Sequence, residues 1–436
     1  MKHVFSCVTA FAVALPAVPA WAQMDHGHMN HGDMDHSETD HATAPEAAGH
    51  AMPAAHDPLA MSAAMASGTA RLPDAERSMN GLHLMTGDWM VMAHGYAWGV
   101  HTDQGGPRGD AKTYVQSMAM LNAQGPIGEG ARLTLKSMWS LEPLMSARGY
   151  PNLFATGETA GGVPLIDRQH PHDLFMELAA RVDIDIAPGA TAFLYGGPVG
   201  EPALGPSAFM MRRSARYNAE APISHHWFDS THITYGVVTA GVAARGFQIE
   251  ASAFRGREPD EERWGIESPK LDSWSVRASW TPSPNWAAQL SYGRLKSPEV
   301  THTGEDEGRL TASVHYADER LSVTGAFSAK NRLPGPMLNA WLLEGNWNPS
   351  GGHNLFGRFE RTRNDELFPH GDPLHGQAFN VAKFQAGYAY RIPLGDKFGL
   401  ALGGSGALYA KPAALDAAYG RSPKSWTVFA RLSLGD

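Results

Sequence analysis

The feature that most constrains the fold is a two-residue alternation of apolar and polar side chains, which recurs along the chain after Arg71. In residues 273–280, tryptophan, valine and alanine occupy every second position, and serine and arginine fill the positions between them. Successive side chains of a β-strand point to opposite faces, so such a segment has one apolar and one polar face. Residues 173–185, 320–328 and 426–434 follow the same pattern. An all-β fold is therefore predicted.

The links between these segments distinguish a membrane barrel from a soluble β-sandwich, which would show the same alternation. Short links take turns with long ones such as 141–172 and 198–230, and this is typical of an outer-membrane up-and-down antiparallel β-barrel. Lipid offers the backbone no hydrogen-bonding partner, so a closed barrel is the only sheet that can span it. About sixteen strands are predicted, near residues 88–98, 112–122, 129–140, 173–185, 190–197, 231–242, 246–255, 271–281, 285–294, 309–317, 320–328, 337–347, 353–362, 379–392, 397–403 and 424–434.

Aromatic residues support a transmembrane β-barrel, which we assign to residues 85–436. Trp and Tyr recur near the predicted strand ends on the apolar face, as the interfacial girdles of membrane proteins require. They are Trp274, Trp280, Trp286, Tyr292, Tyr388, Tyr390 and Trp426. We therefore expect the protein to lie in the cell outer membrane, in contact with outer-membrane lipid.

Composition excludes two other classes. Past the first two dozen residues there is no run of about 18 apolar residues, so no spanning helix is predicted. The formal net charge is −9, whereas a nucleic-acid partner requires a basic surface. We expect neither a helical transporter nor a nucleic-acid-binding protein.

The first 22 residues are typical of an export signal peptide. Lys2 and His3 precede an apolar stretch over residues 4–18, and residues 20–22 (Ala-Trp-Ala) have the form of a cleavage site. Cys7 is the only cysteine of the chain. Cleavage would remove it, so the mature protein is expected to have neither a thiol nor a disulfide.

Residues 23–80 are predicted to form a disordered Met/His-rich tail in the periplasm, because so polar a segment buries too little apolar surface to fold. Thioethers favour Cu(I), while imidazole and carboxylate suit Cu(II) and other divalent transition metals. The sequence leaves open whether the tail binds metal, which we favour, or is a polar linker that happens to be rich in histidine. Its candidate metal ligands are Met24, His26, His28, Met29, His31, Met34, His36 and His41.

A tail with the segments MDHGHM (24–29) and GDMDH (32–36), joined to an outer-membrane barrel, resembles the outer-membrane copper resistance protein B family. The resemblance covers the architecture and the tail composition. It implies a role in tolerance to copper or a similar metal at the outer membrane, and it assigns no role to any residue of the barrel.

Two loop-to-strand junctions in the barrel carry further candidate metal ligands. They lie at residues 167–173 and 224–232 and enter the fourth and sixth predicted strands, so they are expected on the same rim of the barrel, ~10 Å apart. Their imidazoles and carboxylate suit a divalent ion, but such groups also pin loops inside a lumen by satisfying buried backbone groups. Both interpretations stay open. The ligand candidates are His170, His172, His225, His226, Asp229 and His232.

The long 198–230 loop also contains three arginines, Arg212, Arg213 and Arg216. Folded inward and facing Glu177 and Asp183, they would form a charged constriction that sorts solutes by charge. Alternatively, they would neutralise lipid phosphates at the outer surface.

The sequence therefore predicts an outer-membrane β-barrel that serves in tolerance to copper or a related transition metal. It would bind the ion through its tail and export it, with metal ions and periplasmic metal-handling proteins as partners. The alternative is a general diffusion porin with an incidental tail. A third reading is an outer-membrane hydrolase that uses Ser224, His225 and Asp229 at the external mouth, but no catalytic motif is recognisable and we expect no enzyme.

Overall fold

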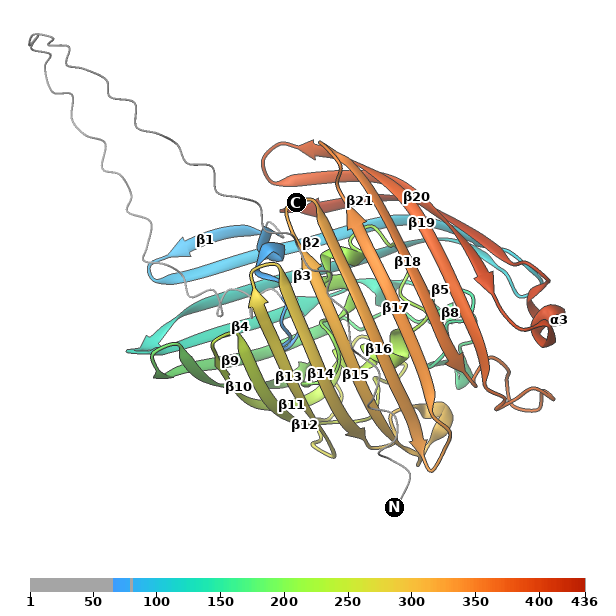
Figure 1. The fold of residues 1–436 in the computed structure, drawn as a ribbon, viewed down its shortest axis with the longest axis horizontal. Coiled ribbons are helices and arrows are strands. Elements are labelled where there is room, and N and C mark those ends of the chain that lie inside the picture. Colours follow the sequence, from blue (N-terminus) through green and yellow to red (C-terminus); the bar gives the residue numbers. More distant parts are fainter. Residues whose placement is uncertain (1–65, 79–80, 436) are drawn as a thin grey trace, which may run out of the picture. The chain divides into compact units, whose positions relative to one another are not determined.

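Sixteen antiparallel strands close into a barrel in the computed structural model, which describes residues 66–78 and 81–435 (Figure 1). These residues all belong to the compact unit Ala55–Asp436. The barrel strands are β2 (Trp89–Gln104), β3 (Ala111–Gly128), β4 (Ala131–Trp139), β9 (Phe175–Ala187), β10 (Ala190–Gly200), β11 (Thr234–Ala244), β12 (Phe247–Phe254), β13 (Ser273–Ser283), β14 (Trp286–Leu295), β15 (Asp306–Ala317), β16 (Leu321–Leu333), β17 (Leu338–Trp347), β18 (His353–Asn364), β19 (Phe379–Leu394), β20 (Phe398–Ala410) and β21 (Lys424–Leu434).

The barrel closes through β2, which pairs with β3 on one side and with β21 on the other. Residues 95–104 of β2 pair with β21, and residues 89–93 pair instead with a seventeenth strand, β1 (Leu82–Thr86). The β1–β2 hairpin thus continues the sheet where β21 ends. The predicted number and order of the barrel strands are confirmed, but β1 is not predicted, because its five residues carry too short an alternation.

Short turns gather at one end of the barrel and long loops at the other, as the sequence predicts. The turn after β9 spans residues 188–189, and the turn after β11 spans residues 245–246. Gly189 and Gly246 have positive φ, a conformation that glycine adopts without steric cost. We call these two ends the turn end and the loop end. In bacterial outer-membrane barrels the short turns face the periplasm.

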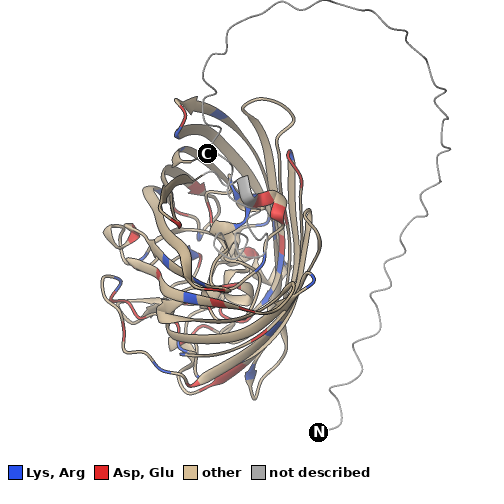
Figure 2. Cartoon of the chain, turned by 90° about the vertical axis from the view of Figure 1, so that its left-hand side faces the viewer, with Lys and Arg blue, Asp and Glu red and all other residues tan. Residues whose placement is uncertain are grey.

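The outer face of the strands is apolar and exposed, and the charged side chains of the strands are mostly buried on the inner face. Figure 2 marks the positions of the charged residues along the chain. Such an apolar outer face suits contact with lipid. The predicted aromatic positions of the outer face are indeed exposed. Among the described residues, no helix is long and apolar enough to cross a membrane.

A charge placed in this apolar band should destabilise the barrel. Leu343, in the middle of β17 on the outer face, is 54% exposed. We expect Leu343→Arg to lower the free energy of unfolding in lipid vesicles by about 2–4 kcal/mol, the cost of an arginine at the bilayer midplane. Urea titration measures this loss, and Leu343→Val is the matched control. A Leu343→Arg barrel as stable as the control would contradict a lipid-facing outer surface.

The lumen is filled by two loops that fold inward from the loop end. The loop between β4 and β9 contains η2 (Glu142–Leu144) and the short strands β5 (Tyr150–Pro151), β6 (Thr159–Ala160), β7 (Val163–Pro164) and β8 (Arg168–Gln169). The loop between β10 and β11, residues 201–233, contains η3 (Phe209–Met211), η4 (Arg213–Ala215), α2 (His225–Phe228) and η5 (Ser230–His232). Shorter links carry η6 (Val300–His302), η7 (Ala413–Leu415) and α3 (Asp416–Tyr419).

Because these loops fill the lumen, the polar residues that the strands turn inward are buried rather than bathed in water. Thr239, Arg309, Glu344 and Glu360 are at most 1% exposed. Hydrogen bonds and ion pairs to the loops satisfy such groups: Arg277 donates to the Gly205 carbonyl at 3.0 Å.

The predicted tail ran to residue 80, but residues 66–78 lie inside the barrel and include η1 (Asp74–Ser78). Lys136 of β4 donates to the carbonyl oxygens of Ala66 and Gly68 at 2.6 and 2.9 Å. Arg71 donates to Gln248 of β12 at 2.8 Å. The segment has too few apolar residues to fold alone, but the lumen supplies polar partners that the local sequence does not show. Residues 1–65 lie outside the described part of the chain.

Candidate metal centre

Five histidines from the two predicted junctions meet in the loop-filled lumen. His170 and His172 precede β9, His225 and His226 form the first turn of α2, and His232 ends η5. Neighbouring ring centroids lie 5.1–6.3 Å apart, and all five side chains are buried. The structure thus brings together all the histidines that the sequence singles out in the barrel. We call this group the histidine centre.

Each imidazole of the histidine centre is anchored through its Nδ1 atom by an oxygen acceptor. His172 donates to Glu142 at 2.9 Å, His225 to Asp229 at 2.7 Å and His226 to Glu258 at 3.1 Å. The other two rings donate to backbone carbonyls: His170 to that of Pro171 at 3.1 Å and His232 to that of Asp229 at 2.6 Å. Since every partner is an acceptor, Nδ1 carries a proton in each ring, and in a neutral ring the lone pair lies on Nε2. Metal-binding histidines are held in this way, with the second nitrogen donating to a carboxylate or carbonyl.

A metal ligand needs a ring nitrogen that no protein group already engages, and several rings of the histidine centre have one. The Nε2 atoms of His172, His226 and His232 are buried without a hydrogen-bond partner among the described residues. His170, His225 and His226 offer one ligand atom each, and these atoms lie within 4.8 Å of one another. Three imidazoles with room for a fourth ligand are a common site for zinc and other late transition metals.

Gly157 leaves room for this arrangement. A Cβ atom built there would lie 2.4 Å from Nε2 of His226, and its φ of +137° is a conformation that other residues rarely adopt. Only glycine lets the loop between β4 and β9 pass so close to the ring.

Burial lowers the pKa of three of the five imidazoles, whereas carboxylates outweigh burial and raise the pKa of the other two, His172 and His226. Burial lowers the pKa of His170 and His232 well below the ordinary value, and it also lowers the pKa of His225 despite the opposing Asp229 carboxylate. Burial acts on His226 too, but the Glu258 carboxylate outweighs it and raises the pKa to about 9. Burial raises the pKa of Glu158 to about 7. Glu158 lies 3.2 Å from Nε2 of His170.

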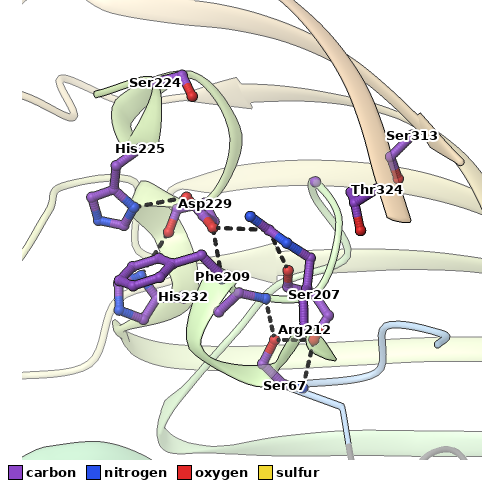
Figure 3. Close-up of polar contacts among 12 residues, drawn as sticks. Ser67, Ser207, Phe209, Arg212, Ser224, His225, Asp229, His232, Ser313 and Thr324 are labelled. Atoms are coloured by element: carbon purple, nitrogen blue, oxygen red, sulfur yellow. Dashed lines mark hydrogen bonds and ion pairs between the residues drawn. The ribbon is translucent and has the colours of Figure 1, made fainter. Parts of the chain in front are cut away.

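The structure gives the Asp229 side chain a different role from the one that the sequence suggests. Asp229 supports the histidine centre rather than offering a free ligand, because its carboxylate accepts from His225, from the Phe209 backbone NH at 2.9 Å and from Arg212 at 3.3 Å (Figure 3). Loop-pinning and metal binding are thus combined here, with the carboxylates pinning the loop and the imidazoles facing one another.

The charged residues of the predicted constriction form ion pairs with other residues than expected. Arg212 does turn inward, but it pairs with Glu344 at 2.7 Å and with Asp229. Glu177 pairs with Lys136 at 3.3 Å, and Asp183 pairs with Arg181 at 2.8 Å. Glu177 thus finds its partner on the neighbouring strand β4 and Asp183 on its own strand β9, so the proposed facing of charges is wrong.

The hydrolase reading is not supported by the positions of its residues. Ser224 donates its hydroxyl hydrogen to Glu360 at 2.7 Å, and Figure 3 draws no hydrogen bond between Ser224 and His225. A nucleophile of the proposed kind needs a hydrogen bond to the base that activates it.

Two further groups of possible ligands lie between the histidine centre and the loop end, and consecutive groups share a residue. His226 is shared with Glu258 and Glu299, and Glu299 is shared with His302 and Glu366. Beside them is a cavity of about 290 Å³ whose wall includes Glu158, Glu258, Asp260, Glu261 and Glu262. Glu142, Glu158 and Glu299 are not predicted, since isolated acids in long loops carry no spacing signal. Glu258 is not predicted because it stands in a run of acids that is typical of a solvated loop face, whereas the structure buries it.

The tail ligands that the sequence predicts lie outside the described residues. They are Met24, His26, His28, Met29, His31, Met34, His36 and His41.

Removing the anchor of one histidine tests the centre without removing a ligand. We expect Glu258→Gln to weaken Zn(II) binding by about 10- to 100-fold, because it removes the carboxylate that orients His226. Isothermal titration of the detergent-solubilised protein measures the change. Glu262→Gln is a control on the same loop, and equal affinities for the two variants would contradict the role of Glu258.

No protein-family model matches the chain, and no curated protein sequence matches it. The resemblance to the copper resistance protein B family therefore has no matching model behind it. Among solved structures, OmpF of Salmonella typhi in complex with daunomycin matches with a TM-score of 0.52 and 10% identity, covering 81% of this chain and 100% of its own. An anion-selective porin from Comamonas acidovorans has a TM-score of 0.48 and 12% identity over 79% of this chain and 99% of its own. Pseudomonas putida OprB has a TM-score of 0.48 and 9% identity over 80% and 94%. The chain thus has the fold of a porin-like outer-membrane β-barrel.

Proposed function

We propose that the protein is an outer-membrane barrel that binds a transition-metal ion at the histidine centre inside its lumen. In doing so it would contribute to tolerance of copper or a related metal, by holding the ion or by passing it outward. One observation carries the proposal: five buried imidazoles face one another, each anchored through Nδ1 by an oxygen acceptor. Such an arrangement leaves the second nitrogens as a set of soft-to-borderline donors.

The second candidate is a general diffusion porin, and the likeness to OmpF favours it. A diffusion porin needs a water-filled lumen. Here the inward-facing polar residues of β11, β15, β17 and β18 are buried under the loops. This burial supports the metal-binding function, whereas the likeness in fold supports the porin.

Metal titration and conductance separate the two functions. We expect the purified full-length protein to bind Zn(II) or Cu(II) at the histidine centre, and we expect its conductance in planar bilayers to change when that metal is added. A plain porin would conduct at a level indifferent to the metal. A wide, metal-insensitive conductance together with no metal bound by the barrel histidines would refute the proposal.

The tail is a separate part of the proposal and rests on its composition. We expect a chain without residues 23–65 to hold less copper per folded barrel than the full-length chain, because it lacks the thioethers and imidazoles of the tail. Metal analysis after desalting measures the difference. Unchanged bound copper would leave the tail as a plain linker, while the histidine centre would be judged by its own variants.

A further inference from the structure

A second group of soft donors lies on the inner wall of the barrel, away from the histidine centre. It belongs to a buried apolar cluster in which six of nine buried members are methionines. The methionines are Met92, Met118, Met120, Met138, Met176 and Met211. Among the buried members the cluster contains no leucine, although leucine is the usual choice where packing alone decides.

The strand register places three of the donors in one row across the wall. His94 of β2 lies opposite Met120 of β3, and Met120 lies opposite Met138 of β4. The next residue in the row, on β9, is Glu177. Directly opposite side chains have Cβ atoms about 4.5–5.5 Å apart, and all four side chains are buried. An imidazole and two thioethers thus stand side by side on neighbouring strands of the inner wall.

The polar atoms of this row are those of a ligand set rather than of a packed core. Glu177 uses Oε1 to accept from Tyr195 at 2.8 Å and to pair with Lys136, but its Oε2 is buried without a hydrogen-bond partner among the described residues. Buried polar atoms normally have partners. Asn122 donates to the Met120 sulfur at 3.3 Å and fixes the position of that thioether. A methionine that only fills a gap in an apolar core would need neither the carboxylate of Glu177 nor the amide of Asn122 beside it.

A small cavity is lined both by His94, one end of the row, and by His172 of the histidine centre. Its volume is about 40 Å³, which is enough for a water molecule or an ion. Its wall includes His94, Tyr96 and Met210 on the side of the row, and Glu142 and His172 on the side of the histidine centre.

We propose that His94, Met120 and Met138 form a binding site for a soft monovalent cation of the Cu(I) or Ag(I) class. Thioether ligands select such ions over divalent ones, while imidazole accepts both. The site differs from the histidine centre in ligand chemistry and in the ion that it takes, so each site can be tested without the other.

The test reads the methionines directly in the full-length protein. The chain is labelled with ¹³C at the methionine methyl groups, and Ag(I) is added to the protein in detergent without thiols. Met120→Leu and Met138→Leu identify the two resonances. We expect both to shift with Ag(I) and to stay in place with Zn(II), while the resonance of the exposed Met337 does not move at the same Ag(I) concentration.

A binding measurement completes the test. The double variant Met120→Leu, Met138→Leu should retain one Ag(I) ion fewer per chain than the Met337→Leu control, and it should retain its Zn(II). Unshifted Met120 and Met138 resonances in excess Ag(I) would overturn the proposal, and so would an unchanged Ag(I) content of the double variant. Shifted resonances in a protein that binds no Zn(II) would support this site and refute the histidine centre.

Discussion

Replacing His170 and His225 together by glutamine should abolish tight binding of Zn(II) by the barrel. Both residues belong to the group of three whose ligand atoms lie within 4.8 Å of one another, so the double variant retains only His226 of that group. Loss of a supporting partner alone costs about 10- to 100-fold in metal affinity, and loss of two direct ligands should therefore cost more than about 100-fold. Isothermal titration with Zn(II), repeated with Cu(II), measures the change.

The matched control for this variant is His315→Gln. His315 of β15 is also a buried lumen histidine, and it bonds to Ser313 and Thr324 at 3.1 and 3.0 Å rather than to a neighbouring imidazole. Its replacement should leave metal affinity unchanged. Heat-modifiability on gels shows whether each variant is a folded barrel. Equal Zn(II) affinity in the folded double variant and in the control would refute the histidine centre.

The barrel could be predicted from the sequence because its two determinants are local. Alternation gives each strand a lipid face and a lumen face, and link lengths give the up-and-down order. Both signals survive errors of several residues at the strand ends: the predicted strand 397–403 extends to Ala410 in β20, and the predicted strand 88–98 extends to Gln104 in β2. Neither signal applies to β1, which is too short for its alternation to be recognised.

The histidine centre could be predicted only in part. His170 and His226 stand in dense local runs, and the strand order places both runs near each other, so the sequence suggests the meeting. Glu142 and Glu258 are as important for the geometry, but they lie in loops whose path depends on the shape of the lumen. The same reason explains the wrong partners assigned to Arg212. Its actual partner Glu344 is 132 residues away in sequence, and only the inward fold of the 201–233 loop brings them together.

Replacing Arg212 by methionine should open the lumen. Arg212 is buried and holds the 201–233 loop to the wall by its bond to Glu344 of β17 at 2.7 Å. Its bond to the Ser207 carbonyl at 2.9 Å lies within the loop (Figure 3). Removing one partner of a buried ion pair costs about 3–5 kcal/mol. Here Glu344 keeps Arg358 at 2.9 Å, so the cost should fall at or below the lower end of that range. The loss falls on the docking of the loop, because the strands keep their backbone ladders.

We therefore expect the Arg212→Met barrel to remain folded and to conduct ions in planar bilayers at a clearly higher level than the wild type, with larger fluctuations as the loop leaves the lumen. Arg294→Met is the control, since Arg294 is 54% exposed and its 3.2 Å pair with Asp306 is of the surface kind that contributes at most about 1 kcal/mol. The loop also carries His225 and His226, so the same variant should bind Zn(II) more weakly. An unchanged conductance with unchanged Zn(II) affinity would show that the loop is held by other contacts. A wild-type conductance already as high as that of the variant would instead favour the diffusion porin, because the loops would then leave the lumen without help.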